Sequence, residues 1–262
     1  MAPVAIAELA AFNAADEASV KDAATIPEKT RLAAFIITEI SSSTVDPDAL
    51  PILLLSAKII LRSSDASSAV LKTPSAIDLY TSFAAANDAS STVAVKVLLN
   101  AFVSSEPSLS TELKVHFIQN AGLEAMIALL QSATSASLQL QVVKVFHLFC
   151  GTVPSITTIL VENHNLLHML ISSLCYCVRN KPESPYIPPP IALLTTEILR
   201  TLFSIACANP HYLTAKTDES LFHMMTQLGV VCVDMLHKPQ QTPQLYNLKL
   251  DVVKLLMVSP ED

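Results

Sequence analysis

The sequence predicts an all-α protein whose helices stack as hairpins into an α-solenoid. The 262 residues contain three glycines and no tryptophan, whereas sheet-rich and phosphate-binding folds use glycine for turns of positive φ and for close backbone approach. Apolar residues recur at i, i+3, i+4 and i+7 in successive blocks, the period of helices with one buried face. Because 51% of the residues are hydrophobic and 15% are charged, each helix needs neighbours that cover its apolar face.

The periodic blocks set the expected helices and the breaks between them. Asp46 and Ser90 are plausible N-terminal caps, because short oxygen-bearing side chains accept from the first helical N–H groups. The proline-dense segment 180–190 is expected to be an exposed extended loop. The helices are expected near 3–15, 27–41, 49–63, 74–86, 91–105, 109–120, 122–132, 137–151, 154–162, 164–179, 190–208, 218–237 and 243–258.

The composition and the chain's start argue against a membrane-spanning or secreted protein. The longest stretch without a charged residue, 125–143, is interrupted by polar residues at its centre, so it is not a continuous apolar span. The first residues lack the basic region and compact apolar core of a secretory signal. The sequence therefore predicts no integral membrane segment and a cytoplasmic location.

No motif indicates an enzyme, a cofactor, a metal site or a nucleic-acid surface. The net charge of −7 disfavours nucleic acid as a partner. The five cysteines lie in apolar helical runs and are interpreted as reduced core thiols. Cys175 and Cys177 have the wrong spacing for a zinc knuckle, and His164 with His168 lacks a third ligand. No catalytic motif is present.

One pattern repeats along the chain: a helix in which apolar residues are followed by a single basic residue and then by three mostly apolar residues. The period brackets that of armadillo and HEAT repeats, in which each such helix packs against the next. We therefore predict an armadillo/HEAT-like right-handed α-solenoid of about five repeats, forming a single domain over residues 1–262. The basic residues are Lys58, Lys96, Lys144, Arg200 and Lys254, separated by 38, 48, 56 and 54 residues.

Gly122 lies in the passage that most resembles an armadillo repeat, between two expected helices. A glycine there permits a sharp turn where a Cβ would clash. The corresponding turn of the next unit carries Asn163, His164 and Asn165. Asparagine also tolerates the left-handed conformation, so the same geometry is expected there.

The recurrent basic residues have two interpretations. A lysine on a mostly buried helix can pack its stem and keep its ammonium in water, without binding anything. Alternatively, equivalent positions of a solenoid align in space, and Lys58, Lys96, Lys144 and Arg200 would form a cationic ladder that attracts an acidic segment or a terminal carboxylate. Asn100, one turn after Lys96, could then hydrogen-bond a bound backbone.

The same helices resemble the synembryn family of exchange factors and chaperones for G-protein α subunits. The resemblance extends over about residues 50–260 and depends on passages that occur in the family's order. These are Ala57-Lys58-Ile59-Ile60-Leu61-Arg62, Val95-Lys96-Val97-Leu98-Leu99-Asn100, Val143-Lys144-Val145-Phe146-His147, the prolines 188–190 followed by Glu197-Ile198-Leu199-Arg200-Thr201-Leu202-Phe203, and Tyr246 to Pro260.

The resemblance implies a monomeric, cofactor-free protein that binds a Gα subunit. It implies capture of the Gα C-terminal helix in the concave groove, with guanine nucleotide exchange and assisted folding as the outcome, and attachment to the inner face of the plasma membrane through the partner. The implied contact residues are Lys58, Arg62, Lys96, Asn100, Lys144 and Arg200.

Two departures keep an alternative open. Ser204 stands where the family has asparagine. Family members are about twice as long, so the chain is expected to correspond to their N-terminal part, either as a fragment of a longer protein or as a truncated gene product. The alternative is a generic armadillo scaffold that binds another protein's peptide or helix without exchange activity.

Overall fold

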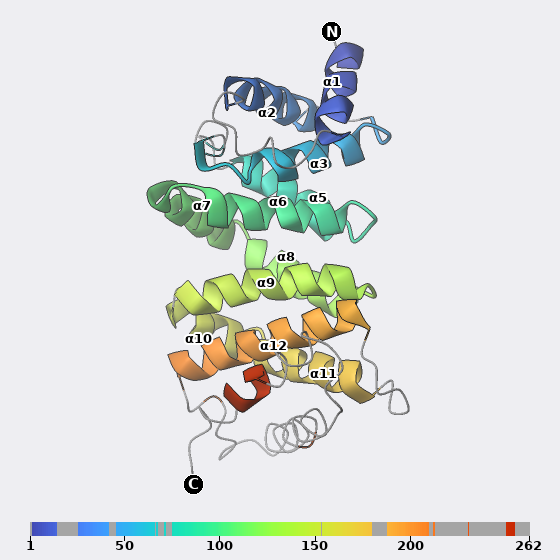
Figure 1. Cartoon of the computed structure of the whole chain (residues 1–262). Helices are drawn as coiled ribbons and strands as arrows, with labels where there is room; N and C mark the ends of the chain where they lie inside the picture. The colour runs from blue at the N-terminus through green and yellow to red at the C-terminus, as the bar shows by residue number, and fades with distance from the viewer. Residues whose placement is uncertain are drawn as a thin grey trace. The chain divides into compact units, whose positions relative to one another are not determined.

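The computed structural model describes residues 2–14, 26–41, 46–65, 67, 71, 75–152, 154–179, 188–209, 212, 230 and 250–254 (Figure 1). Within these ranges all regular secondary structure is helical and no strand occurs, so the all-α prediction is confirmed. The chain divides into two compact units, Met1–Ser132 and Ala133–Asp262. The predicted continuity of one solenoid over residues 1–262 stays a prediction.

The first unit is built from helices in which each packs on its sequence neighbour and on a helix of the next layer. α3 contacts α1, α2 and α6, while α5 contacts α6 and α8. This pattern buries an apolar face on each helix, as the period of the sequence required. The described helices are α1 (Ala2–Ala14), α2 (Ile26–Ile40), α3 (Leu50–Ile60), α5 (Ser75–Ala85), α6 (Ser91–Ser104), α7 (Pro107–Gln119) and α8 (Gly122–Ser132).

Gly122 allows α7 and α8 to approach each other closely. A Cβ added to Gly122 would lie 2.4 Å from Cδ2 of Phe117, so no other residue fits without moving that ring. Phe117 is fully buried and packs edge-on against Phe102, with ring centroids 5.2 Å apart. The predicted clash at Gly122 is confirmed, but the turn itself has its positive φ of 58° at Ala121.

The second unit also consists of helices that each bury an apolar face, and it is centred on α12, the longest of the described helices. α12 packs along α9 and also contacts α10 and α11. Asn165 has a φ of 53° at the turn between α10 and α11, as the asparagines in that turn predicted. The described helices are α9 (Ala136–Thr152), α10 (Pro154–Glu162), α11 (Leu166–Arg179) and α12 (Pro189–Ala208), followed by the short segment 250–254.

Buried hydroxyl groups join the end of one helix to the start of the next. Ser110 Oγ donates to the carbonyl oxygen of Phe102, and Ser91 Oγ donates to that of Phe83 at 3.2 Å. In the second unit Thr157 Oγ1 donates to the carbonyl of Cys150 at 3.3 Å. The last carbonyls of a helix have no partner inside it, so these hydroxyls satisfy groups that burial would otherwise leave unpaired.

By length and composition α12 could cross a membrane, and it is the only described helix for which this is true. In its most apolar window 56% of the residues are buried inside the protein. Glu197 and Arg200 lie near its middle and face α9 or the segment 250–254. This burial and polarity are those of a core helix that holds the second unit together.

Several local predictions need correction. Pro189 and Pro190 form the first turn of α12, where the missing N–H of proline is harmless, so the loop predicted at 180–190 ends earlier. Ser90 is not a side-chain cap for α6; its hydroxyl donates to Asp88 at 2.6 Å. Cys207 is exposed, not a core thiol. The rest of the proline loop, 180–187, and nearly all of the helices expected at 218–237 and 243–258 lie outside the described residues.

Candidate functional site

In the first unit the predicted contact residues lie on the least buried faces of α3 and α6. Lys58 is half-buried in the last turn of α3, and Lys96 is half-buried near the middle of α6. Arg62 is exposed just beyond the end of α3. Around Lys96 the face continues through Leu99 and Asn100 to Val103, which is 66% exposed. The exposed surface of these two helices therefore combines the positive charges of lysine and arginine side chains with apolar side chains.

Asn100 joins these two helices. Its Nδ2 donates to the main-chain carbonyl of Lys58 at 2.7 Å. Asn13 makes the same kind of contact from α1, since its Nδ2 donates to the carbonyl of Ile52 at 3.2 Å. The side-chain amide of Asn100 thus has a partner within the fold, and its contact with a bound backbone stays a prediction.

In the second unit, α9 and α12 face each other through a cluster of charged groups. Lys144 and His147 are half-buried on α9. His147 Nδ1 lies 2.5 Å from Oε1 of Glu197, a residue of α12 that is almost completely buried. Arg200, one turn later on α12, places Nη1 3.9 Å from Oε2 of Glu197. A buried carboxylate therefore lies among the basic groups that the sequence predicted as a ladder.

Glu197 remains charged in spite of its burial. Burial by itself raises the pKa of this carboxyl group, but the hydrogen bond from His147 and the charges of His147, Lys144 and Arg200 together lower it below its ordinary value. A charged carboxylate can be buried only when hydrogen bonds and opposite charges replace its water. This arrangement links α9 to α12.

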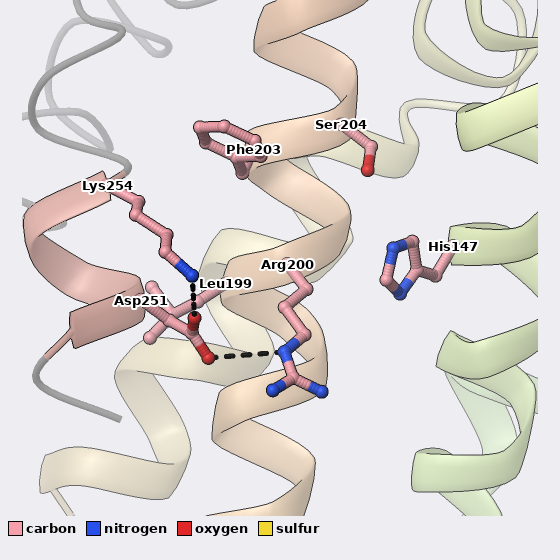
Figure 2. Close-up of a pocket in the computed structure, with 7 residues that line it drawn as sticks. All are labelled: His147, Leu199, Arg200, Phe203, Ser204, Asp251 and Lys254. Atoms are coloured by element: carbon pink, nitrogen blue, oxygen red, sulfur yellow. Dashed lines mark hydrogen bonds and ion pairs between the residues drawn. The ribbon is translucent and has the colours of Figure 1, made fainter. Parts of the chain in front are cut away.

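A pocket of about 240 Å³ opens beside this cluster (Figure 2). Asp251, also nearly buried, accepts from Arg200 Nε at 3.2 Å and from Lys254 Nζ at 3.4 Å. Figure 2 shows these two cations approaching Asp251 from different elements, with Ser204 and Phe203 farther along α12. The pocket is lined by His147, Leu199, Arg200, Phe203, Ser204, Asp251 and Lys254.

The structure brings the predicted residues together in two groups. Lys58, Lys96 and Asn100 lie on adjoining helices of the first unit, and Lys144 and Arg200 both act on Glu197 in the second. Each group presents positive charge beside apolar side chains, which is suited to acidic segments of another protein. A single ladder through both groups stays a prediction.

Four members of the site were not predicted from the sequence: His147, Glu197, Asp251 and Lys254. Glu197 precedes Arg200 by three residues on a helix, a spacing that places opposite charges side by side. Lys254 belongs to the recurrent basic set and was available from the pattern. The contacts of His147 with Glu197 and of Arg200 with Asp251 join residues 50 and 51 positions apart, and no local pattern shows such pairs.

The side chains that could bind a metal ion or act as a nucleophile in the described part of the chain include those of histidine and cysteine. The described residues contain no group of three or more histidine, cysteine, aspartate or glutamate side chains placed to hold a metal ion. Burial raises the pKa of the Cys150 thiol to about 11 in spite of its hydrogen bond with Thr157, which keeps it protonated and unreactive at neutral pH.

Comparison with solved structures gives the fold. A designed armadillo repeat protein superimposes with a TM-score of 0.66 at 10% identity, covering 97% of this chain and 92% of that one. Two engineered proteins of the Northeast Structural Genomics Consortium give the same TM-score at 12% and 13% identity, covering 96% of this chain and 87% and 89% of theirs. At such identities the likeness establishes the armadillo-type all-α fold alone.

Comparison with protein families goes further than the fold. A search of the curated proteins gave no match. The family model described as guanine nucleotide exchange factor synembryn (Ric8) matches residues 53–261, which include every predicted contact residue. The chain belongs to the guanine nucleotide exchange factor synembryn family.

Proposed function

We propose that the protein binds a G-protein α subunit, promotes release of its guanine nucleotide and assists its folding. The observation that carries this proposal is the family match, because it extends over residues 53–261 and the family is one of guanine nucleotide exchange factors. An armadillo-type fold suits the role, since stacked helices offer long surfaces for another protein's helix or peptide.

The mechanism we propose is capture of the C-terminal helix of the Gα subunit. Exchange needs no catalytic group of its own, because a protein that binds one state of Gα more tightly shifts its conformational equilibrium. Holding the C-terminal helix away from its nucleotide-coupled position would favour the nucleotide-free state. The same contact would shield an apolar helix while Gα folds.

The contact residues in this mechanism are the basic residues of the two described faces. Lys58, Arg62 and Lys96 of the first unit would attract acidic groups of the Gα helix, with Leu99 and Val103 covering its apolar side. Lys144 and Arg200 would do the same in the second unit, in which Arg200 lines the pocket. Location in the cytoplasm, and at the inner face of the plasma membrane through Gα, is part of the proposal.

The test is GDP release from a purified Gα subunit, followed with a fluorescent nucleotide, in the presence of the full chain. Acceleration is expected with intact Gα and not with Gα that lacks its last residues. A pull-down with the same two Gα forms separates binding from exchange. Undiminished binding of the truncated Gα would contradict capture of its C-terminal helix.

The second candidate is an armadillo scaffold that binds another protein's peptide or helix and has no exchange activity. It is favoured by the likeness to a designed armadillo repeat protein, since that fold functions as a binding surface in general. The two candidates differ in the exchange assay: a scaffold leaves the rate of GDP release unchanged even if it binds Gα.

A further inference from the structure

Two cations line the second unit's pocket, Arg200 and Lys254, and they differ in the number of carboxylates that each contacts. Arg200 contacts two buried carboxylates on different elements: Glu197 on its own helix and Asp251 on the segment 250–254. Lys254 contacts only Asp251 among the ion pairs of the described residues, three residues away in its own segment and at 3.4 Å. Arg200 thus joins two elements, whereas Lys254 joins none.

The consequences of losing each cation are therefore unequal. Without Lys254, Asp251 still accepts from Arg200 Nε at 3.2 Å. Without the guanidinium, Asp251 keeps only the longer contact with Lys254, and Glu197 loses one of its neighbouring charges. Buried carboxylates that lose a partner destabilise a fold strongly, while an exposed pair contributes little.

We infer that Lys254, a recurrent basic residue that was not among the predicted contact residues, is the cation of this pocket that first meets acidic groups of a partner, and that Arg200 serves mainly as the structural link that supports it. The Lys254 side chain is 51% exposed at the mouth of the pocket, beside Phe203 and opposite His147. Its flexible ammonium can move from a long contact to a ligand at small cost to the fold. The inference rests on the proposed function for the identity of the partner.

The test uses two variants of the full chain that are expected to behave in opposite ways. Lys254→Gln removes the charge and keeps the stem, so affinity for a purified GDP-bound Gα subunit is expected to fall about three- to tenfold at low salt, with the melting temperature unchanged. Arg200→Lys keeps the charge but loses the planar fork that contacts both carboxylates. Its melting temperature is expected to fall by about 3–6 °C, and its loss of affinity is expected to be smaller than that of Lys254→Gln.

A short poly-glutamate peptide, hexaglutamate, serves as a second probe, and Lys114→Gln on α7 is the matched control for loss of one lysine charge.

If the chain binds hexaglutamate through Lys254 but does not bind Gα, the proposed function fails and the inference stands. If Gα binds but Lys254→Gln leaves both affinities unchanged, the inference fails and the proposed function stands. Binding of neither probe, or equal loss of affinity in the Lys254 and Arg200 variants, would overturn the inference.

Discussion

Replacing Gly122 with alanine is expected to destabilise the first unit, although alanine is the better helix former. The new Cβ would lie 2.4, 2.5 and 2.6 Å from Cδ2, Cε2 and Cγ of Phe117, about 1 Å closer than carbon atoms normally approach. Because Phe117 is fully buried against Phe102, its ring cannot swing into solvent.

The size of the effect follows from two opposing contributions. Overpacking a core typically costs about 1–3 kcal/mol. Alanine recovers at most about 0.5–1 kcal/mol of backbone entropy relative to glycine. We therefore expect Gly122→Ala to lower the free energy of unfolding by about 1–2 kcal/mol, or the melting temperature by roughly 2–8 °C.

Urea denaturation followed by circular dichroism at 222 nm measures this change, and the absence of tryptophan makes helix content the natural signal. Phe117→Leu provides the control, because a smaller side chain leaves room for the added Cβ. In a double-mutant cycle the alanine should be less harmful in the leucine background. A neutral Gly122→Ala variant, or strictly additive effects, would refute the explanation by collision with Phe117.

Three further predictions follow from the contacts of the two units. The pKa of Glu197 is lowered in the folded protein, so its charged carboxylate stabilises the fold above the ordinary glutamate pKa, and this stabilisation is lost as pH falls through the lowered pKa. Glu197→Gln should therefore flatten the loss of stability below about pH 4.5 in acid titrations followed by circular dichroism. Asn100→Ala removes the hydrogen bond to the Lys58 carbonyl and should lower the free energy of unfolding by about 1 kcal/mol in urea; no change would show that this bond is replaced by water. Among the described cysteines, exposed Cys207 should react first with a maleimide at pH 7, while buried Cys150, with its pKa raised to about 11, should stay unmodified in mass spectra; the reverse order would contradict the described burial.

The helices were predictable because their signal is local. The apolar period placed α8 and α10 at their observed bounds, and most other described helices within a few residues, since one buried stripe per helix fixes both type and extent. Gly122 was identifiable because glycine is rare in this chain. The left-handed turn at Ala121 was not, because alanine carries no signal for positive φ.

The candidate site was predictable only in part, because charge in a fold is a pairwise property. The recurrent lysines and Arg200 were visible one at a time as basic residues on apolar helices. Among the contacts with carboxylates, only the pair of Glu197 and Arg200, three residues apart, has a local signal. The others were not visible, since Glu197 meets His147 across 50 residues and Asp251 meets Arg200 across 51. From the sequence alone, Lys144 and Arg200 were both predicted to contact a partner. The contacts of Arg200 with Glu197 and Asp251 show that it also links elements within the fold.

The asparagine contacts of α3 bear on how such a chain can evolve. Asn13 and Asn100 each bond a main-chain carbonyl of that helix, at Ile52 and Lys58. A main-chain carbonyl is the same whatever side chain its residue carries, so substitutions at Ile52 or Lys58 leave these two bonds available. Helices joined in this way can change their surface side chains while the hydrogen bonds that fix their register are retained.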